Sequence, residues 1–289
     1  MSQLLKAKRS GAIPSAIFFT IFFTLLSIAG SIYLSIGVGN PVNKVIDGLL
    51  SSTSFKNNAG GYFVSKALES ATGDERKLLT EKAPQISATV TTILSNSAFK
   101  VAVESISDTA YNYYVGGTKE RQSIDVKPIL RLALPIFESV DPQFSKLSKE
   151  LDKIEPIKLK PQTQGPDFAQ IKSYFTLGVL LLLLLSILSL LLYLRFANSL
   201  RSALRVPGII VLSIGIFLIS LNITATAIVK HQAATSTESL AREAIPIAAH
   251  ALTSPIMTNG AVGLLLGLLL LGLSFLKRFH PDRLDPPIQ

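Results

Sequence analysis

The sequence contains no cysteine and no tryptophan among its 289 residues. Without cysteine, the chain can form neither disulfides nor thiolate metal sites. Charged residues are scarce as well, because they make up 16% of the chain, whereas about a quarter of a typical soluble protein is charged. Hydrophobic residues supply 48%. They are concentrated in blocks, which is typical of a protein that crosses a membrane several times.

Motifs for catalysis, nucleotide binding or metal binding are also missing. The sequence has no GxSxG, P-loop, GxGxxG or HExxH pattern. Its acidic clusters, such as Asp74-Glu75 and Glu150-Asp152, lie among lysines, as expected for solvated helix faces. We therefore expect a protein that is not an enzyme and that binds no cofactor or metal.

The most leucine-rich stretch, residues 174–196, carries no charge before Arg195. About 20 helical residues cross the hydrocarbon core of a bilayer, so this stretch predicts a transmembrane helix. Three further blocks predict spans at 12–38, 208–229 and 260–276. A cleaved signal peptide is the alternative for the first block, but its apolar character continues well past Ala29, which favours an uncleaved span.

Residues 40–171, between the first and second spans, form a long polar insert with 16 Lys/Arg and 15 Asp/Glu. Apolar residues recur at helical spacing from Gln85 to Tyr114, and Gly116-Gly117 ends the pattern. We expect a helix there, and we expect four of its apolar side chains to be buried: Ile93, Phe99, Val103 and Ile106.

Further helix starts are expected at Pro128 and after Asp141-Pro142, and Pro135 is expected to kink or end the first of these helices. Residues 155–167 are rich in proline and predict a linker. The predicted fold is an all-α integral membrane protein with four transmembrane helices. A mainly helical extracytoplasmic domain at 40–171 separates helices 1 and 2.

Basic residues in short loops mark the cytoplasmic side of a membrane. The N-terminus (1–11), the turn at 197–206 and the tail at 277–289, counted with Arg195, hold nine Lys/Arg against two acids. The opposite loop, 230–256, is balanced in charge. We expect both termini to be cytoplasmic and the protein to lie in a bacterial cytoplasmic membrane. The net charge of +9 then reflects topology, and no nucleic-acid partner is expected.

Small and polar residues within the spans predict contacts between helices. Gly263 and Gly267 form a GxxxG step, and Gly260 is expected to join them in a close helix contact. Asn222, near the outer end of the third span, is expected to hydrogen-bond to a neighbouring helix instead of lining a transport path.

Two polar segments outside the spans are candidate sites. His231, Glu238, Glu243 and His250 include zinc-ligand types, but their spacings of seven, five and seven favour a solvated amphipathic segment. Residues 119–121 (Lys119, Glu120 and Arg121) follow Gly116-Gly117 and are a candidate partner contact. An ordinary solvated turn is the alternative for them.

The order of these parts resembles that of uncharacterised four-span bacterial membrane proteins with a helical extracytoplasmic insert. The apolar blocks, the Gly116-Gly117 break before Ile124-Asp125-Val126-Lys127-Pro128 and the Arg201/Arg205 turn carry this resemblance. The resemblance is one of layout, and it implies no known activity.

We expect this protein to act by association. Its partners are expected to be the lipid bilayer and either another envelope protein or a further copy of this chain. An envelope-complex subunit or scaffold would present the helical outer domain to that partner. The alternative is a small transporter or channel component with a path among the four spans.

Overall fold

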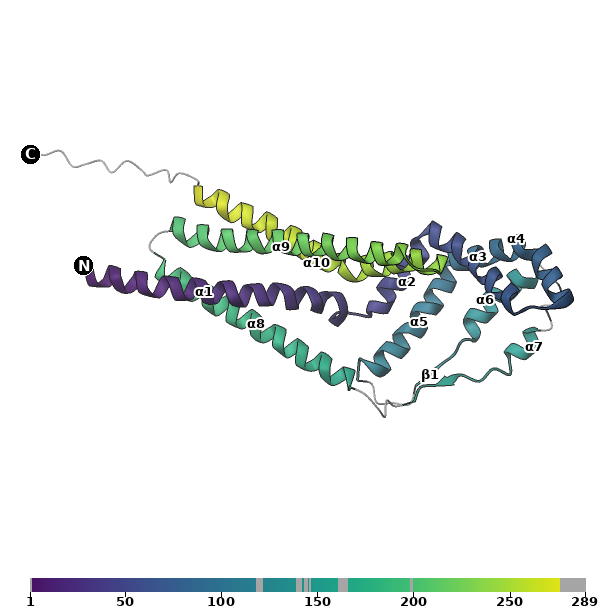
Figure 1. Cartoon of the computed structure of the whole chain (residues 1–289). Helices are drawn as coiled ribbons and strands as arrows, with labels where there is room; N and C mark the ends of the chain where they lie inside the picture. The colour runs from purple at the N-terminus through teal and green to yellow at the C-terminus, as the bar shows by residue number, and fades with distance from the viewer. Residues whose placement is uncertain are drawn as a thin grey trace, which may run out of the picture. The chain divides into compact units, whose positions relative to one another are not determined.

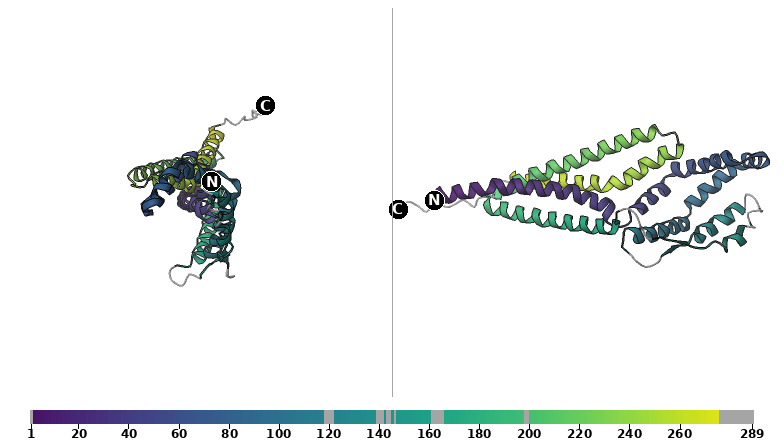
Figure 2. Two further views of the ribbon diagram at one scale, coloured as in Figure 1. Left: turned by 90° about the vertical axis from the view of Figure 1, so that its right-hand side faces the viewer. Right: turned by 60° about the horizontal axis from the view of Figure 1, so that its bottom comes forward.

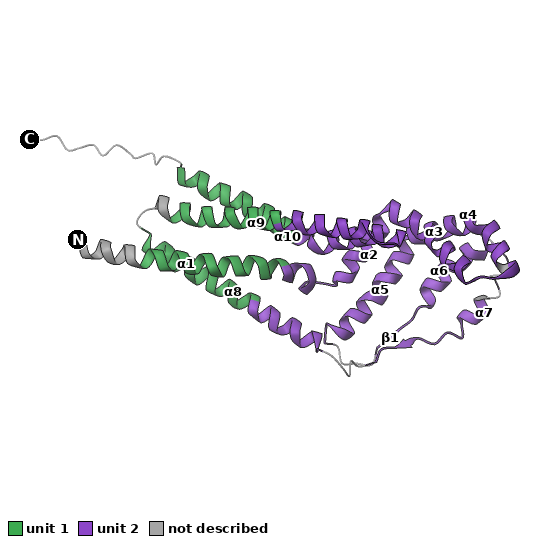
Figure 3. Cartoon of the chain, viewed as in Figure 1, with its two compact units in different colours: residues 1–31, 179–220, 256–289 green, residues 32–178, 221–255 purple. Residues whose placement is uncertain are grey.

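The computed structural model describes residues 2–117, 122–138, 142, 145, 147–160, 166–197 and 200–275. It is 87% helical. The chain divides into two compact units, shown in Figure 3. One comprises residues 1–31, 179–220 and 256–289, and the other comprises residues 32–178 and 221–255. Long helices of the chain contain residues of both units.

Within the described residues, four helices are long and apolar enough to cross a membrane. They are α1 (Ser2–Ile32, extended by a π-helical turn η1 at Tyr33–Gly37), α8 (Phe168–Phe196), α9 (Leu200–Ala234) and α10 (Ser239–Phe275) (Figure 1). Many of their leucines are exposed; Leu184 of α8, for example, is 62% exposed. Apolar side chains that no protein atom covers suit contact with lipid. The prediction of a mainly helical chain with four helices able to cross a membrane is therefore confirmed.

The polar segment predicted as a loop at 230–256 is mostly helical. Helix α9 continues to Ala234 and α10 begins at Ser239, so only residues 235–238 connect them. Alanine-rich sequence favours helix, and the two prolines inside α10 do not end it. Pro255 leaves the carbonyl of Ala251 without its helical donor, and the hydroxyl of Ser254 lies 3.4 Å from that oxygen and donates to it.

The insert contains further helices in the second unit, drawn from purple to teal in Figures 1 and 2. They are α2 (Pro41–Ser51), α3 (Thr53–Ser70), α4 (Gly73–Ser95), α5 (Ser97–Tyr114), α6 (Lys127–Glu138) and α7 (Leu147–Leu151). Two short strands, β1 (Ser123–Ile124) and β2 (Ile157–Lys158), pair antiparallel, with Ser123 opposite Lys158. The strands join the two ends of the segment that carries α6 and α7.

Helices α3 and α4 lie side by side and form the core of the insert (Figure 2). Gly60 permits the close contact, because a Cβ at this position would lie 2.5 Å from the carbonyl oxygen of Ser87. Ala59 and Val64 of α3 are buried, as are Val90 and Ile93 of α4. Burying one large aliphatic side chain contributes about 1.5–3 kcal/mol, so a few such residues suffice to hold this pair together.

The single helix predicted from Gln85 to Tyr114 is wrong, because the chain breaks at Asn96. Asn96 is extended (φ −79°, ψ 124°), and its side-chain oxygen accepts a hydrogen bond from the backbone of Ala98. Helices α4 and α5 meet there at 67°. The change in phase of the apolar stripe after position 93 was the sequence signal of this break, and α4 also begins earlier than expected, at Gly73.

The break changes the burial that was predicted for this region. Ile93 is buried, as expected. Phe99, Val103 and Ile106 lie on α5 and are only half-buried. The bend at Asn96 turns α5, which carries these three residues, away from the α3–α4 core.

The other predicted boundaries of the insert are partly confirmed. Pro128 is the second residue of α6, whose first amide, that of Lys127, donates to the side chain of Asp125 at 3.0 Å. Pro135 lies inside α6 and does not end it. Asp141, expected to begin the next helix, lies outside the described residues.

Candidate functional site: the attachment of the insert to the membrane helices

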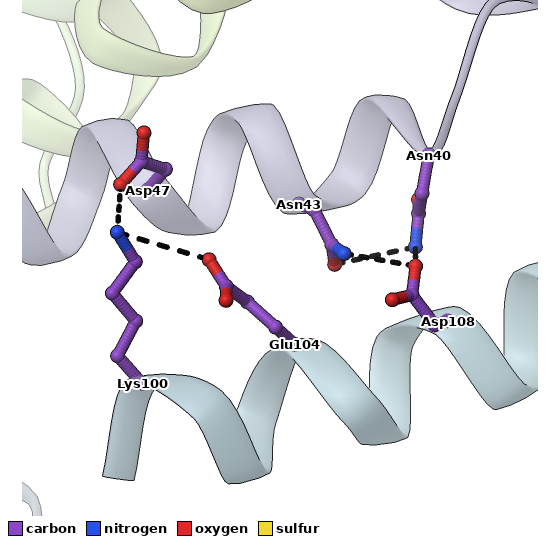
Figure 4. Close-up of polar contacts among 6 residues, drawn as sticks. All are labelled: Asn40, Asn43, Asp47, Lys100, Glu104 and Asp108. Atoms are coloured by element: carbon purple, nitrogen blue, oxygen red, sulfur yellow. Dashed lines mark hydrogen bonds and ion pairs between the residues drawn. The ribbon is translucent and has the colours of Figure 1, made fainter. Parts of the chain in front are cut away.

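A polar network joins the start of α2 to α5 (Figure 4). Asn40 caps α2 by accepting a hydrogen bond from the backbone of Val42 at 3.0 Å. Its amide nitrogen donates to Asp108 of α5 at 3.0 Å. Asn43, one turn along α2, donates to the same carboxylate oxygen at 2.8 Å. Because both asparagines bond to one oxygen of Asp108, the network fixes the register between the two helices.

An ion pair continues this contact two turns further along α2. Asp47 pairs with Lys100 of α5, and Glu104 lies 3.8 Å from the same ammonium (Figure 4). The hydrogen bond with Asp47 raises the pKa of Lys100 above its ordinary value of 10.5, with desolvation opposing the rise. Exposed pairs contribute little to stability, so this one serves mainly to align α2 with α5.

The insert is also attached to the end of the first membrane helix and to the start of the second. Lys44 of α2 donates to the carbonyl oxygens of Leu34 and Ser35, in the last turn before the chain leaves the membrane helix, at 2.8 and 3.3 Å. Lys172 of α8 donates to the hydroxyl of Tyr111 of α5 at 3.1 Å. Its ammonium also lies 5.1 Å from the centre of the Tyr111 ring, within the range of a cation–π contact.

A third attachment joins the insert to α10. One carboxylate oxygen of Glu243 accepts hydrogen bonds from the hydroxyl of Ser54, at 2.6 Å, and from the amide of Asn58, both on α3. The other oxygen is buried and has no hydrogen-bond partner among the described residues. Helix α10 also touches α2, because a Cβ at Gly48 would lie 3.0 Å from a side-chain carbon of Ile247.

An open cavity of about 670 Å³ lies between α2 and α10. Its walls are mostly apolar, and three charged or titratable side chains line it: Lys44, Asp47 and His250. A second open cavity, of about 780 Å³, lies between α5 and α6. Val101 of α5 lines this second cavity and is 64% exposed. Both cavities belong to the second unit.

The glycines predicted to mediate helix packing all face α9, within the first unit. A Cβ at Gly260 would lie 2.8 Å from the side chain of Ile219, and one at Gly267 would lie 2.5 Å from the backbone nitrogen of Leu212. Gly263 is looser, with its nearest neighbour, the Cα of Gly215, at 3.3 Å.

Sequence reasoning missed Gly215, which completes this contact from the α9 side. A Cβ on Gly215 would lie 2.5 Å from the backbone nitrogen of Leu264. The sequence does contain a signal for this contact, because Gly208 and Gly215 lie seven residues apart on α9. Residues seven apart lie on the same face of a helix.

Asn222 bonds to a neighbouring helix, and the structure does not bring it together with the three glycines. Its amide donates to the carbonyl oxygen of Thr253 on α10 at 2.9 Å, within the second unit. Sequence reasoning did not anticipate a second such bond, from Asn259 of α10 to the hydroxyl of Ser31 of α1 at 3.0 Å, within the first unit.

The remaining candidate residues form no common site. Lys119, Glu120 and Arg121 lie outside the described residues. In the part of the chain that is described, no three metal-ligating side chains come together, and this includes the four residues that were weighed as a zinc site: His231, Glu238, Glu243 and His250. Glu243 instead bonds to α3, and no local sequence motif predicts this contact.

Comparison of the sequence and the structure with family models, curated proteins and solved structures finds no match. The fold therefore defines only the class of the protein and no family. The class is a helical membrane protein with four candidate spans and a helical insert between the first two.

Proposed function

We propose that this protein is a non-enzymatic integral membrane protein that acts by association, with the insert as an extracytoplasmic domain presented to a partner. The partner is another envelope protein or a further copy of this chain. The protein would lie in the cytoplasmic membrane of a bacterium with both termini inside. The uneven placement of Lys and Arg supports that orientation, since Arg195 and Arg205 lie at neighbouring ends of α8 and α9.

The observation that carries the proposal is the attachment of the insert to three membrane helices. Lys44 bonds to η1, the turn that extends α1, Tyr111 bonds to Lys172 of α8, and Ser54 bonds to Glu243 of α10. A domain on flexible linkers would need none of these contacts. Fixing the orientation of a domain at the membrane lowers the entropic cost of docking a neighbour, which suits a scaffold or a complex subunit.

The polar groups inside the spans favour association over transport. Asn222 and Asn259 both donate across helix contacts, which is the usual role of such residues in membranes. The apolar cores of the four blocks contain no Asp, Glu, Lys or Arg, whereas ion pathways usually carry such groups. Two buried hydroxyls without a hydrogen-bond partner among the described residues, those of Ser186 and Thr253, favour the transport alternative.

The mass of the intact particle tests the proposal. The full chain is purified in several mild detergents, and its mass is measured by native mass spectrometry together with anything that copurifies. We expect an oligomer or a defined heteromeric complex. A strictly monomeric particle that supports ion or solute flux in liposomes would contradict the proposal and favour a transporter.

A further inference from the structure

The cavity between α2 and α10 has the composition of a binding site for an amphipathic anion. Apolar side chains form most of its wall, while Lys44 and His250 supply nitrogen donors and serines 51, 52 and 254 supply hydroxyls. Ligand sites commonly combine an apolar wall with a few polar groups that fix orientation. The two nitrogen donors come from different helices, so an anion between them would bridge α2 and α10.

Lys44 places the cavity at the end of a membrane helix. Its ammonium donates to Leu34 and Ser35, in the last turn of the apolar helix Gly11–Gly37. The ring of Tyr33, beside these carbonyls, lies 6.3 Å from that of Phe175 in α8. Tyrosine rings favour the layer between hydrocarbon and water. If this helix crosses a membrane, the ammonium would therefore lie at the level where lipid headgroups begin.

The α10 wall of the cavity lies at a matching level. The last 20 residues of α10, 256–275, are long enough to cross about 30 Å of hydrocarbon. Ser254 lies two residues before this stretch, and His250 lies one turn before Ser254. Both residues would therefore lie in or just outside the headgroup layer, which is about 5–8 Å thick on each side.

The charges around the cavity favour an anion. Among the described residues that line it, Asp47 is the one carboxylate, and the ammonium of Lys100 on α5 pairs with it. Lys100, which Glu104 also approaches at 3.8 Å, thus offsets Asp47 from outside the wall, and Lys44 is the positive charge on the wall itself. An ammonium has three donors and Lys44 uses two of them on backbone carbonyls, so one donor remains for a ligand. Imidazole offers an N–H in either charge state.

We propose that this cavity binds the headgroup of an anionic phospholipid from the outer leaflet. The phosphate is held between Lys44 and His250, and the glycerol and upper acyl chains lie against the apolar wall formed by Pro246, Ile247 and Ala251. The proposal requires that α1 and α10 cross a membrane in the orientation proposed above, and it does not depend on the proposed association. The bound lipid would link the insert to α10 beside the contact of Ser54 with Glu243.

Lipid retention tests the site directly. The full chain, in a non-ionic detergent, is incubated with equal amounts of phosphatidylglycerol and phosphatidylcholine, and native mass spectrometry measures the ratio of the two lipids retained. We expect one phosphatidylglycerol to be retained preferentially. The double variant Lys44→Gln/His250→Gln should lower the ratio about tenfold, as expected for the loss of charge-assisted hydrogen bonds. Lys100→Gln should lower it as well, by leaving Asp47 unpaired.

Matched variants distinguish lipid binding at this cavity from non-specific attraction of an anionic lipid to positive side chains. Lys149→Gln/His231→Gln removes the same side-chain types from exposed positions away from the cavity and should leave the ratio unchanged. Ala251→Leu fills the cavity without a change in charge and should reduce phosphatidylglycerol retention, which keeps the test decisive if the double variant does not fold. Equal loss in both double variants would overturn the proposal, as would retention that Ala251→Leu does not affect. Displacement of the lipid by inorganic phosphate at equal concentration would assign the site to a free anion instead.

Discussion

Glu243 of α10 and Ser54 of α3 are 189 residues apart in the sequence, yet the Ser54 hydroxyl donates to the Glu243 carboxylate at 2.6 Å. Asn58, one turn along α3, donates to the same oxygen. This contact joins the insert to the fourth membrane helix. It also gives a role to a glutamate that the sequence suggested only as a solvated charge or a weak metal ligand.

Glu243→Ala should therefore destabilise the attachment of α3 to α10. A hydrogen bond to a charged group contributes about 1.5–3 kcal/mol, and Glu243 is half-buried, so we expect a loss near the lower end of that range. Thermal unfolding in detergent and limited proteolysis within α3 would measure it. Glu238→Ala, an exposed glutamate five residues earlier, is the control. Equal stability of the two variants would show that the contact contributes nothing.

Because α9 and α10 pack closely, we expect substitutions at two glycines of α10 to differ in their effect on stability. Gly267→Leu forces a side chain onto the backbone of Leu212 and should cost about 1–3 kcal/mol. Gly272→Leu should be neutral, because nothing lies within 4 Å of the position of its Cβ. Melting temperatures of the two variants in one detergent would compare them. A Gly267→Leu variant as stable as Gly272→Leu would show that the helices do not pack here.

The ion pair between Asp47 and Lys100 predicts how the α2–α5 contact depends on pH. The pKa of Lys100 is raised above 10.5, chiefly by its hydrogen bond with Asp47. The pair is therefore fully formed below pH 10.5 and is lost as the pH rises through the raised pKa. Because the chain lacks cysteine, two cysteines introduced at Val42 and Val101 can carry fluorescent labels, and energy transfer between them reports the distance.

We expect this distance to stay constant from pH 7 to about pH 10 and to increase at higher pH, because the hydrogen bond holds the lysine charged up to its raised pKa. In a Lys100→Met variant the alkaline change should disappear. A distance that increases below pH 10, or an alkaline change that persists in Lys100→Met, would contradict this assignment.

The absence of cysteine also permits a direct test of topology. Single cysteines at Lys153 in the insert and at Glu238 between α9 and α10 should react with a membrane-impermeant maleimide added to intact cells. A cysteine at Arg201 should react only after the cells are permeabilised. The turn that contains Arg201 is predicted to lie on the same side as both termini. Reaction at Arg201 in intact cells would therefore place both termini outside and would contradict the orientation inferred from the positive-inside rule.

The membrane helices could be predicted from the sequence because their signal is local. A leucine run such as Leu180–Leu185 favours a lipid environment, and the apolar stretch around it, residues 174–196, is long enough to cross the bilayer. The break at Asn96 was harder to see, because the apolar stripe resumes after it and asparagine alone is a weak signal. The phase shift together with an N-cap residue would have identified it.

The attachment of the insert could not be predicted, for a physical reason. Lys44, Asp108 and Glu243 are ordinary solvated charges in the sequence, and their partners lie 10, 68 and 189 residues away. Helix capping and periodicity report neighbours within a few residues. Contacts between distant helices depend on the tertiary arrangement. The glycine contact between α9 and α10 could be predicted only in part. The GxxxG motif identifies the packing face of α10, but it does not identify the helix that packs against that face.

The central claim is that the insert binds a partner, and photo-crosslinking in living cells tests it most directly. A photoreactive residue is introduced at Val101, Phe63 or Ile157, three exposed apolar positions on α5, α3 and β2, and at Leu184 as a lipid-facing control. We expect at least one insert position, and not Leu184, to give a discrete adduct, either with a second copy of this chain or with the protein that copurifies in mild detergent. Absence of an adduct from all three insert positions, together with a monomeric particle that carries flux in liposomes, would contradict the claim.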